Sequence, residues 1–430
     1  MASLKKRPLF NPEGDIDVTQ RRLIGGNTTN MNDFNNLKYT WTADWYRQAM
    51  NNFWIPEEIN LGQDVKDYRQ LPAAERRAYD KILSFLVFLD SVQSANLPNV
   101  SAYITANEVD LCLTIQSFQE CVHSQSYSYM LDTIASPDER QEIIFQWKDD
   151  EHLLARNTFI GDLYNEFQQE QSRENFLRVL VANYILEGIY FYSGFMFFYN
   201  LGRIGRMPGS VQEIRYINRD ENTHLWLFRN ILRDLRAEEP DLFTPEREEM
   251  MRGMIREGVR QEIAWGKYAI GNEVEGLNEK MIEDYVHYLG NARAESIGLG
   301  TLYDSHFLTQ LSSADGGYVT ARTAADHNDI VFHIFCMYLL NYFQHFTVVG
   351  YYGAFPLFVI ARELDLVGNV APVAVVEEFT RFGFALQVAV DVFDEQVPVE
   401  FRPAVEELLG HIHRITGKPF LPFLGRVALC

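Results

Sequence analysis

Two Glu-x-x-His pairs, 101 residues apart, place the strongest constraint on how this chain folds: Glu120 with His123, and Glu221 with His224. Positions i and i+3 share one face of a helix, so each pair can present a carboxylate and an imidazole to the same point. A single pair of this kind is common in helical proteins. Two pairs indicate a shared site only if other helices supply unpaired carboxylates on their inward faces.

Two further carboxylates meet that condition. Asp90 follows Leu89 on the apolar face of SFLVFLDSVQS, and Glu187 lies in LVANYILEGIYFYSGFMFFY, which has no other charge. A lone carboxylate in such a helix is costly to bury unless something pairs with it. We therefore expect Asp90 and Glu187 to face the two pairs.

Four carboxylates and two imidazoles from four helices form the ligand set of a ferritin-like di-metal bundle. Oxygen and imidazole donors suit iron or manganese, and the absence of thiolate argues against structural zinc. We expect Glu120 and Glu221 to bridge the two metals. Asp149 with His152 and Asp284 with His287 have the same spacing. The first pair sits in a charged run and the second lacks matching lone carboxylates, so neither is expected to bind metal.

The rest of the chain favours an all-α fold, a ferritin-like helical bundle with a di-metal site plus a C-terminal helical extension. From Trp41 onward, apolar residues recur at the three- and four-residue spacing of a helix. Short interruptions containing Gly, Pro or Asp separate these stretches, and no long run alternates between apolar and polar residues. We expect four regions: an extended N-terminal arm (1–40), the bundle (41–310), a linker (311–328) and a C-terminal helical domain (329–430).

Composition narrows the function. The net charge of −21 argues against a nucleic-acid partner, which would need clustered Lys and Arg. Four cysteines without a CxxC pair indicate a reducing compartment, and the N-terminus has no secretory signal, so we expect a cytoplasmic protein. Residues 330–361 carry no Asp, Glu, Lys or Arg. Internal polar residues and the Gly350–Pro356 break disfavour a membrane span there and favour two buried helices.

Tyr127 lies seven residues after Glu120 and four after His123, so it shares the ligand face of their helix. A phenol at that place could be oxidised by a metal pair. On position alone, a core tyrosine bonded to a ligand carboxylate is the better explanation.

Several segments together resemble the class I ribonucleotide reductase small (β) subunit. The resemblance covers about residues 40–303 and is carried by ECVHSQSY (120–127), INRDENTH (217–224), FWIPEEINLGQDVKDYRQLPAAER (53–76), LDSVQ (89–93), LEGIYFYSGF (186–195) and GLNEKMIEDYVHYLGNARAESIGL (276–299).

The resemblance implies a role for each matched residue. One metal would be bound by Asp90, Glu120 and His123, and the other by Glu187, Glu221 and His224. Tyr127 would hold a stable radical in an apolar pocket formed by Phe191, Phe195 and Ile217. Trp54 would donate an electron during oxygen activation and relay the radical, with Asp220 joining it to His123.

The resemblance also implies partners and a reaction. O₂ would oxidise the metal pair (two iron ions per chain, with Mn/Fe or Mn/Mn as the other options) and leave the radical on Tyr127. A separate large (α) subunit would use that radical to reduce ribonucleotides to deoxyribonucleotides, and the small subunit would be a homodimer. Roughly the last 125 residues have no counterpart in the family pattern, and they replace the usual tail that carries a relay tyrosine.

Two other functions fit the same ligands. A ferritin-like di-metal oxidase would act directly on an organic ligand, and it would need an open substrate cavity. An iron-storage bundle would need no radical tyrosine.

Overall fold

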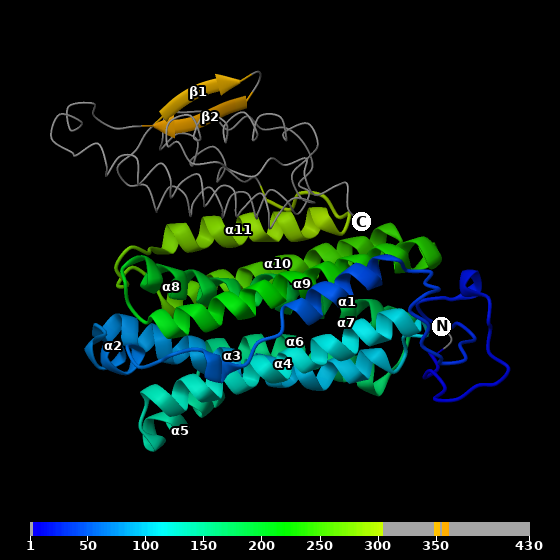
Figure 1. Ribbon diagram of the computed structural model, residues 1–430, viewed down its shortest axis with the longest axis horizontal. Helices are drawn as coiled ribbons and strands as arrows, with labels where there is room; N and C mark the ends of the chain where they lie inside the picture. Colours follow the sequence, from blue (N-terminus) through cyan, green and yellow to red (C-terminus); the bar gives the residue numbers. More distant parts are fainter. Residues whose placement is uncertain (1–2, 304–347, 353–354, 361–430) are drawn as a thin grey trace, which may run out of the picture. The chain divides into compact units, whose positions relative to one another are not determined.

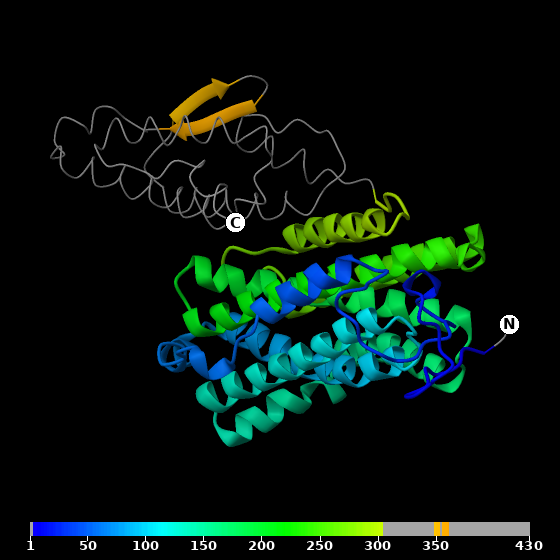
Figure 2. The ribbon, with the colours of Figure 1, turned by 45° about the vertical axis from the view of Figure 1, so that its right-hand side comes forward.

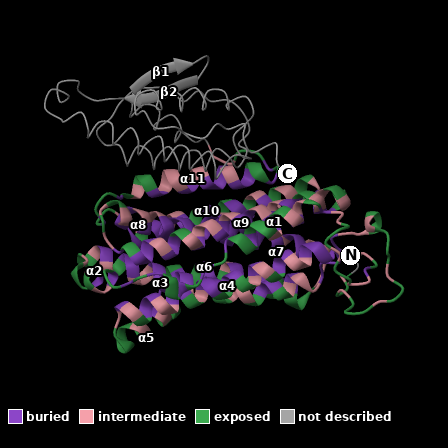
Figure 3. Ribbon diagram, in the orientation of Figure 1, coloured by how far each residue is buried: buried purple, intermediate pink, exposed green. Residues whose placement is uncertain are grey.

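The computed structural model describes residues 3–303, 348–352 and 355–360. The chain divides into two compact units, Met1–Tyr318 and Val319–Cys430. In the described part of the first unit, long helices run side by side and enclose a continuous apolar core (Figures 1 and 2). Their buried faces point toward one another (Figure 3).

The helices follow one another along the chain with short connections. The α-helices are α1 (Trp41–Asn51), α2 (Asp64–Gln70), α3 (Ala73–Ser101), α4 (Asn107–Ile134), α5 (Pro137–Phe145), α6 (Glu151–Gln169), α7 (Arg173–Ile185), α8 (Tyr192–Arg203), α9 (Pro208–Glu238), α10 (Pro245–Ala269) and α11 (Glu279–Ser296). A π-helix, η4 (Leu186–Tyr190), lies between α7 and α8. Short 3₁₀ turns are η1 (Val18–Gln20), η2 (Pro56–Glu58), η3 (Gln146–Lys148) and η5 (Pro240–Leu242).

Local sequence signals start several of these helices. Ser136 and Glu139 form a reciprocal capping box at the start of α5. Asp150 accepts hydrogen bonds from the backbone N–H groups of His152 and Leu153 and so begins α6. Because Asp150 caps a new helix, the stretch Pro137–Gln169 consists of α5, η3 and α6.

The start of α9 is fixed by a carboxylate from another helix. Asp64 of α2 is buried and accepts hydrogen bonds from Gly209 N (2.9 Å) and from Ser210 N and Oγ (both 2.6 Å). A Cβ on Gly209 would lie 2.6 Å from Leu61 Cδ2, so only glycine allows this approach. This contact fixes the start of the helix that carries Glu221 and His224.

The N-terminal arm has little regular structure in residues 3–40, but it is anchored to the helices. Leu23 and Ile24 are buried, and Ile24 pairs with Ile104 through an isolated β-bridge. Arg21 forms an ion pair with Glu108 (3.0 Å). The arm is therefore part of the packed unit.

In the second unit the structure describes an antiparallel strand pair, β1 (Val348–Tyr352) and β2 (Phe355–Ile360). The prediction of two helices over 330–361 is wrong for these residues, while the all-α, ferritin-like fold class is confirmed by the first unit. Both segments are rich in Val, Tyr, Phe and Ile, which favour strands, and a short apolar run does not by itself separate strand from helix. The linker and the rest of the C-terminal domain lie outside the described residues.

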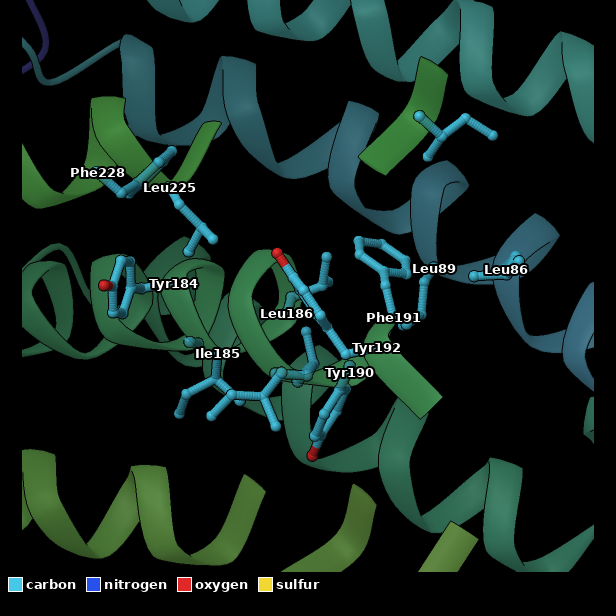
Figure 4. Close-up of a cluster of buried hydrophobic side chains, with 14 of the residues drawn as sticks. Leu86, Leu89, Tyr184, Ile185, Leu186, Tyr190, Phe191, Tyr192, Leu225 and Phe228 are labelled. Carbon is cyan, nitrogen blue, oxygen red and sulfur yellow. The ribbon is translucent and has the colours of Figure 1, made fainter. Parts of the chain in front are cut away.

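One helical run, Arg173–Arg203, is long and apolar enough to cross a membrane by length and composition, and 94% of its most apolar window is buried inside the protein. It comprises α7, η4 and α8. Apolar side chains of α3 and α9, including Leu89 and Leu225, lie in the same buried cluster as those of this run (Figure 4). The run is therefore the central core element of the unit, and it carries Glu187.

Candidate metal centre

Four helical elements bring the six predicted ligands together at one buried place. All six side chains are completely shielded from solvent. They are Asp90 on α3, Glu120 and His123 on α4, Glu187 on η4, and Glu221 and His224 on α9.

The first group of donors surrounds His224. One ligand atom from each of Glu120, Glu187, Glu221 and His224 lies within 4.8 Å of all the others. His224 Nδ1 is 2.9 Å from Glu221 Oε2, 3.2 Å from Glu120 Oε1 and 3.4 Å from Glu187 Oε2.

The second group surrounds His123. Asp90, Glu120 and His123 also place ligand atoms within 4.8 Å of one another. His123 Nδ1 lies 3.4 Å from Glu120 Oε2 and 3.3 Å from Glu221 Oε1, and 3.9 Å from Asp90 Oδ2. Glu120 and Glu221 each direct one oxygen to His123 and the other to His224. This is the arrangement that two bridging carboxylates need.

Several donor atoms lack a hydrogen-bond partner, which fits the binding of a pair of metal ions. Both oxygens of Asp90, Glu120 Oε2, Glu221 Oε1 and His123 Nδ1 are buried without a hydrogen-bond partner. Buried polar atoms are normally paired, and buried charges are paired or coordinate metals. Carboxylate oxygens and imidazole nitrogens together suit iron and manganese.

The electrostatics of the site favour the same conclusion. Burial, followed by repulsion from Glu120, raises the pKa of Asp90 and of Glu187 well above the usual carboxylate range. Burial also raises the pKa of Glu221 to about 7. Burial alone would raise the pKa of Glu120, but the neighbouring His224 and His123 outweigh it and lower the value. Carboxylates this close repel one another unless cations lie between them.

Glutamine side chains form the next layer, and sequence reasoning missed them. Gln116 Nε2 donates to Glu187 Oε1 (2.8 Å), as does Gln93 Nε2. Gln119 Oε1 lies 3.1 Å from His224 Nε2. The signal was available in the spacing, because Gln116 is four residues before Glu120 and Gln93 is three after Asp90, on the same helix faces. Such contacts orient metal ligands.

Trp54, Asp220 and His123 form a continuous hydrogen-bonded chain, as the resemblance implied. Trp54 Nε1 donates to Asp220 Oδ2 (2.9 Å), and the same oxygen lies 3.3 Å from His123 Nε2. Trp54 is 4% exposed and Asp220 is buried. The hydrogen-bonded chain thus leads from the second group of donors to a buried indole.

Tyr127 is fully buried, and its hydroxyl has no hydrogen-bond partner of good geometry. Burial, followed by the charge of Asp90, raises its pKa well above the usual value. Phe191, Phe195 and Ile217 are buried in the same apolar core, with the two phenyl rings stacked at 5.9 Å. Their role as the walls of a radical pocket stays a prediction.

The two other Asp-x-x-His pairs lie away from these donors. Asp149 and His152 are exposed, and the His152 ring stacks on Tyr268. Asp284 forms an ion pair with Lys280, and the His287 ring lies 4.4 Å from that of Tyr303. Neither pair joins a group of metal donors within the described residues.

Long helices packed side by side around two overlapping groups of buried carboxylates and histidines define a ferritin-like di-metal carboxylate protein. The pattern of the ribonucleotide reductase small chain matches residues 31–310, and the chain belongs to this family. Small subunits of the family generate the radical for a large subunit, and this chain is a small subunit of ribonucleoside-diphosphate reductase. The family is usually dimeric.

Individual relatives agree with this assignment. The chain is 68% identical over 303 residues to the ribonucleoside-diphosphate reductase subunit beta of Treponema pallidum, which covers 70% of this chain and 86% of the relative. The R2 subunit structure from Clostridium botulinum is 52% identical, covers 73% of this chain and 99% of its own, and superposes with a TM-score of 0.70. A dimanganese(II)-NrdF structure from Streptococcus sanguinis shares the fold at 20% identity, covering 64% of this chain and 94% of its own, with a TM-score of 0.56.

Proposed function

We propose that the six buried side chains bind two metal ions, that Tyr127 stores the radical, and that Trp54, Asp220 and His123 carry electrons between the site and the surface. Asp90, Glu120 and His123 bind the metal nearer the radical, and Glu187, Glu221 and His224 bind the other. When bound, the metal pair supplies the oxidising power, drawn from O₂, that removes one electron from Tyr127.

The observation that carries this proposal is the Trp54–Asp220–His123 chain. A di-metal oxidase acting on its own organic substrate has no use for an indole bonded to a histidine ligand through a carboxylate. It would also need an open cavity at the donors. The hollow beside Trp54 measures only about 20 Å³, which is room for little more than a water molecule.

The surroundings of Tyr127 suit a stored radical. Because its pKa is raised, the phenol keeps its proton until it is oxidised, so the electron and the proton have to leave together. Complete burial then separates the oxidised ring from water and from small reductants. Among the neighbouring charges, Asp90 raises the pKa of Tyr127 most, so we assign it the task of orienting the phenol.

We propose iron as the metal, two ions per chain. The donor set also suits manganese, and the Streptococcus sanguinis neighbour is named as a dimanganese protein. Mn/Fe and Mn/Mn are therefore the outcomes that metal analysis of the isolated protein has to separate from Fe/Fe.

The remaining parts of the proposal concern partners. We propose a homodimer that works in the cytoplasm with a large subunit and with O₂, and that binds neither nucleic acid nor a membrane. The strong negative charge supports the exclusion of nucleic acid.

Reconstitution with the cognate large subunit tests the proposal. Tyr127→Phe removes the oxidisable hydroxyl and keeps the packing of the ring. We expect this variant to bind its metals and to produce no deoxynucleotide, while the unaltered chain is active. Full activity of Tyr127→Phe would exclude Tyr127 as the radical store.

A further inference from the structure

The π-helix η4 carries Glu187, and charged side chains from three other helices bond the backbone of η4 and of the first turn of α8. A π turn displaces backbone groups from the regular α-helical ladder, and such turns occur often at functional sites. The three side chains are Arg156 of α6, Glu262 of α10 and Arg293 of α11.

Arg156 and Glu262 bond the backbone on the two sides of the η4–α8 junction. Arg156 Nη2 donates to the Tyr190 carbonyl (2.8 Å) and forms an ion pair with Glu262 Oε2. Glu262 Oε1 in turn accepts from Ser193 N (2.8 Å). The pair therefore holds the last carbonyl of η4 and an amide in the first turn of α8. Figure 4 shows Tyr190 and Tyr192 on either side of this junction pointing in opposite directions.

Arg293 bonds the middle of the π turn. Its Nε donates to the Gly188 carbonyl (3.1 Å), directly after Glu187. A Cβ on Gly188 would lie 3.1 Å from this Nε and 2.8 Å from Leu225 Cδ2. A side chain at this position would therefore force the Arg293 and Leu225 side chains to shift.

Stability alone does not explain the Arg156–Glu262 pair. The side chains are 1% and 0% exposed, and a buried ion pair of this kind is often no more stable than apolar residues of the same size. Arg156 Nε and Nη1 have no hydrogen-bond partner, although the guanidinium lies 3.7 Å from the centre of the Phe85 ring. What the pair does provide is a fixed position for one backbone group at the end of η4 and one at the start of α8.

We propose that Arg156 and Glu262 are positioning residues that hold the π turn in the form that directs Glu187 at His224 and Glu221. The inference rests on the proposed role of Glu187 as a metal ligand. In this account the pair acts on the metal site of Glu187, Glu221 and His224 and leaves the site of Asp90 and His123 unaffected.

The test is Mn(II) binding to the full chain, followed by the EPR signal of free Mn(II). The double variant Arg156→Met with Glu262→Gln removes both charges and keeps an acceptor for Ser193 N. We expect one of the two ions per chain to bind about 10- to 100-fold more weakly and the other to bind within about twofold of the unaltered chain. Arg156→Lys keeps the charge with a single donor group. Its affinity for the weakened ion is expected to lie between those of the double variant and the unaltered chain.

Two controls separate positioning from general destabilisation. Leu153→Ala creates a cavity in the same helix, α6, but removes no hydrogen bond or ion pair, and should leave both Mn(II) affinities unchanged. Glu187→Ala should not bind at all the ion that the double variant binds more weakly. If Glu187→Ala loses one ion while the double variant binds both normally, the positioning role is wrong. If Glu187→Ala also binds both, the ligand assignment itself is wrong. Equal weakening by Leu153→Ala would likewise overturn the positioning role.

Discussion

Glu120 belongs to both groups of buried donors, so its removal should affect both metal ions. We predict that Glu120→Ala loses at least one metal ion per chain, because water refills an opened ligand position only in part. Elemental analysis of the purified protein measures this. His152→Ala is the matched control: it removes the histidine of a pair with the same spacing, and it should keep the metals of the unaltered chain. Full occupancy in Glu120→Ala would contradict the ligand assignment.

Trp54 is the end of the hydrogen-bonded chain that lies farther from the metal donors, through Asp220 to His123. We predict that Trp54→Phe retains its metals but forms the radical more slowly and in lower yield, because the indole N–H that bonds Asp220 is gone. Stopped-flow absorption after mixing with Fe(II) and O₂ follows this. Trp41→Phe is the control. Trp41 also donates to an aspartate, Asp234 (2.8 Å), but this pair is not part of the Trp54–Asp220–His123 hydrogen-bonded chain. Identical kinetics in the two variants would remove Trp54 from the electron route.

Glu213 gives a prediction on pH. Both of its oxygens are buried without a hydrogen-bond partner, and burial raises its pKa from 4.5 to about 9. The folded state therefore holds this proton more tightly than the unfolded chain does. The resulting stabilisation is fully present below pH 4.5 and is lost as the pH rises through about 9.

Glu213→Gln cannot lose a proton, so its free energy of unfolding should fall less steeply with pH. We predict that it exceeds the stability of the unaltered chain at pH 8 by about 1–3 kcal/mol, with little difference near pH 5. Urea unfolding across this pH range measures both curves. Parallel curves would mean that Glu213 is ionised in the folded protein.

At the scale of elements, Asp64 holds the start of α9 from outside that helix. We predict that Asp64→Ala lowers the free energy of unfolding by about 1–3 kcal/mol, because two buried backbone N–H groups and the Ser210 hydroxyl lose their acceptor. Asp64→Asn keeps one acceptor oxygen and should cost less. Denaturant unfolding compares the two. An effect of Asp64→Ala no larger than that of Asp64→Asn would show that the start of α9 is fixed by other contacts.

The elements differ in how far the sequence predicts them. The helices were predicted where apolar residues recur at three- and four-residue spacing. Four of the six donors were found because residues i and i+3 share one helix face, and Asp90 and Glu187 were found as lone carboxylates in apolar stretches. The π turn was not predicted, because LEGIY is composed of ordinary helix-compatible residues and its support comes from Arg156, Glu262 and Arg293. These contacts join positions 34, 69 and 105 residues apart in the sequence, which no local pattern reveals. The strand pair was missed because an uncharged apolar run fits helix and strand alike.

At the scale of the whole molecule, the family match ends at residue 310, and residues 311–430 lie beyond it. The last tyrosines of the chain, Tyr351 and Tyr352, fall in β1. We predict that a chain ending near Ser313 binds its metals and forms the Tyr127 radical but loses turnover with the large subunit, because it lacks the C-terminal segment that would replace the usual docking tail. Radical yield and deoxynucleotide formation measure the two properties separately. Full turnover by the shortened chain would leave the C-terminal unit without a role in coupling.

The account as a whole depends on Tyr127 being oxidised by the metal pair beside it. EPR spectroscopy of the full chain after addition of Fe(II) and O₂ measures this directly. We predict a tyrosyl radical signal that narrows when the protein is made with deuterated tyrosine and is absent from Tyr127→Phe with both metals bound. An unchanged tyrosyl signal in Tyr127→Phe, or no tyrosyl signal from the fully metallated, unaltered chain, would contradict the account.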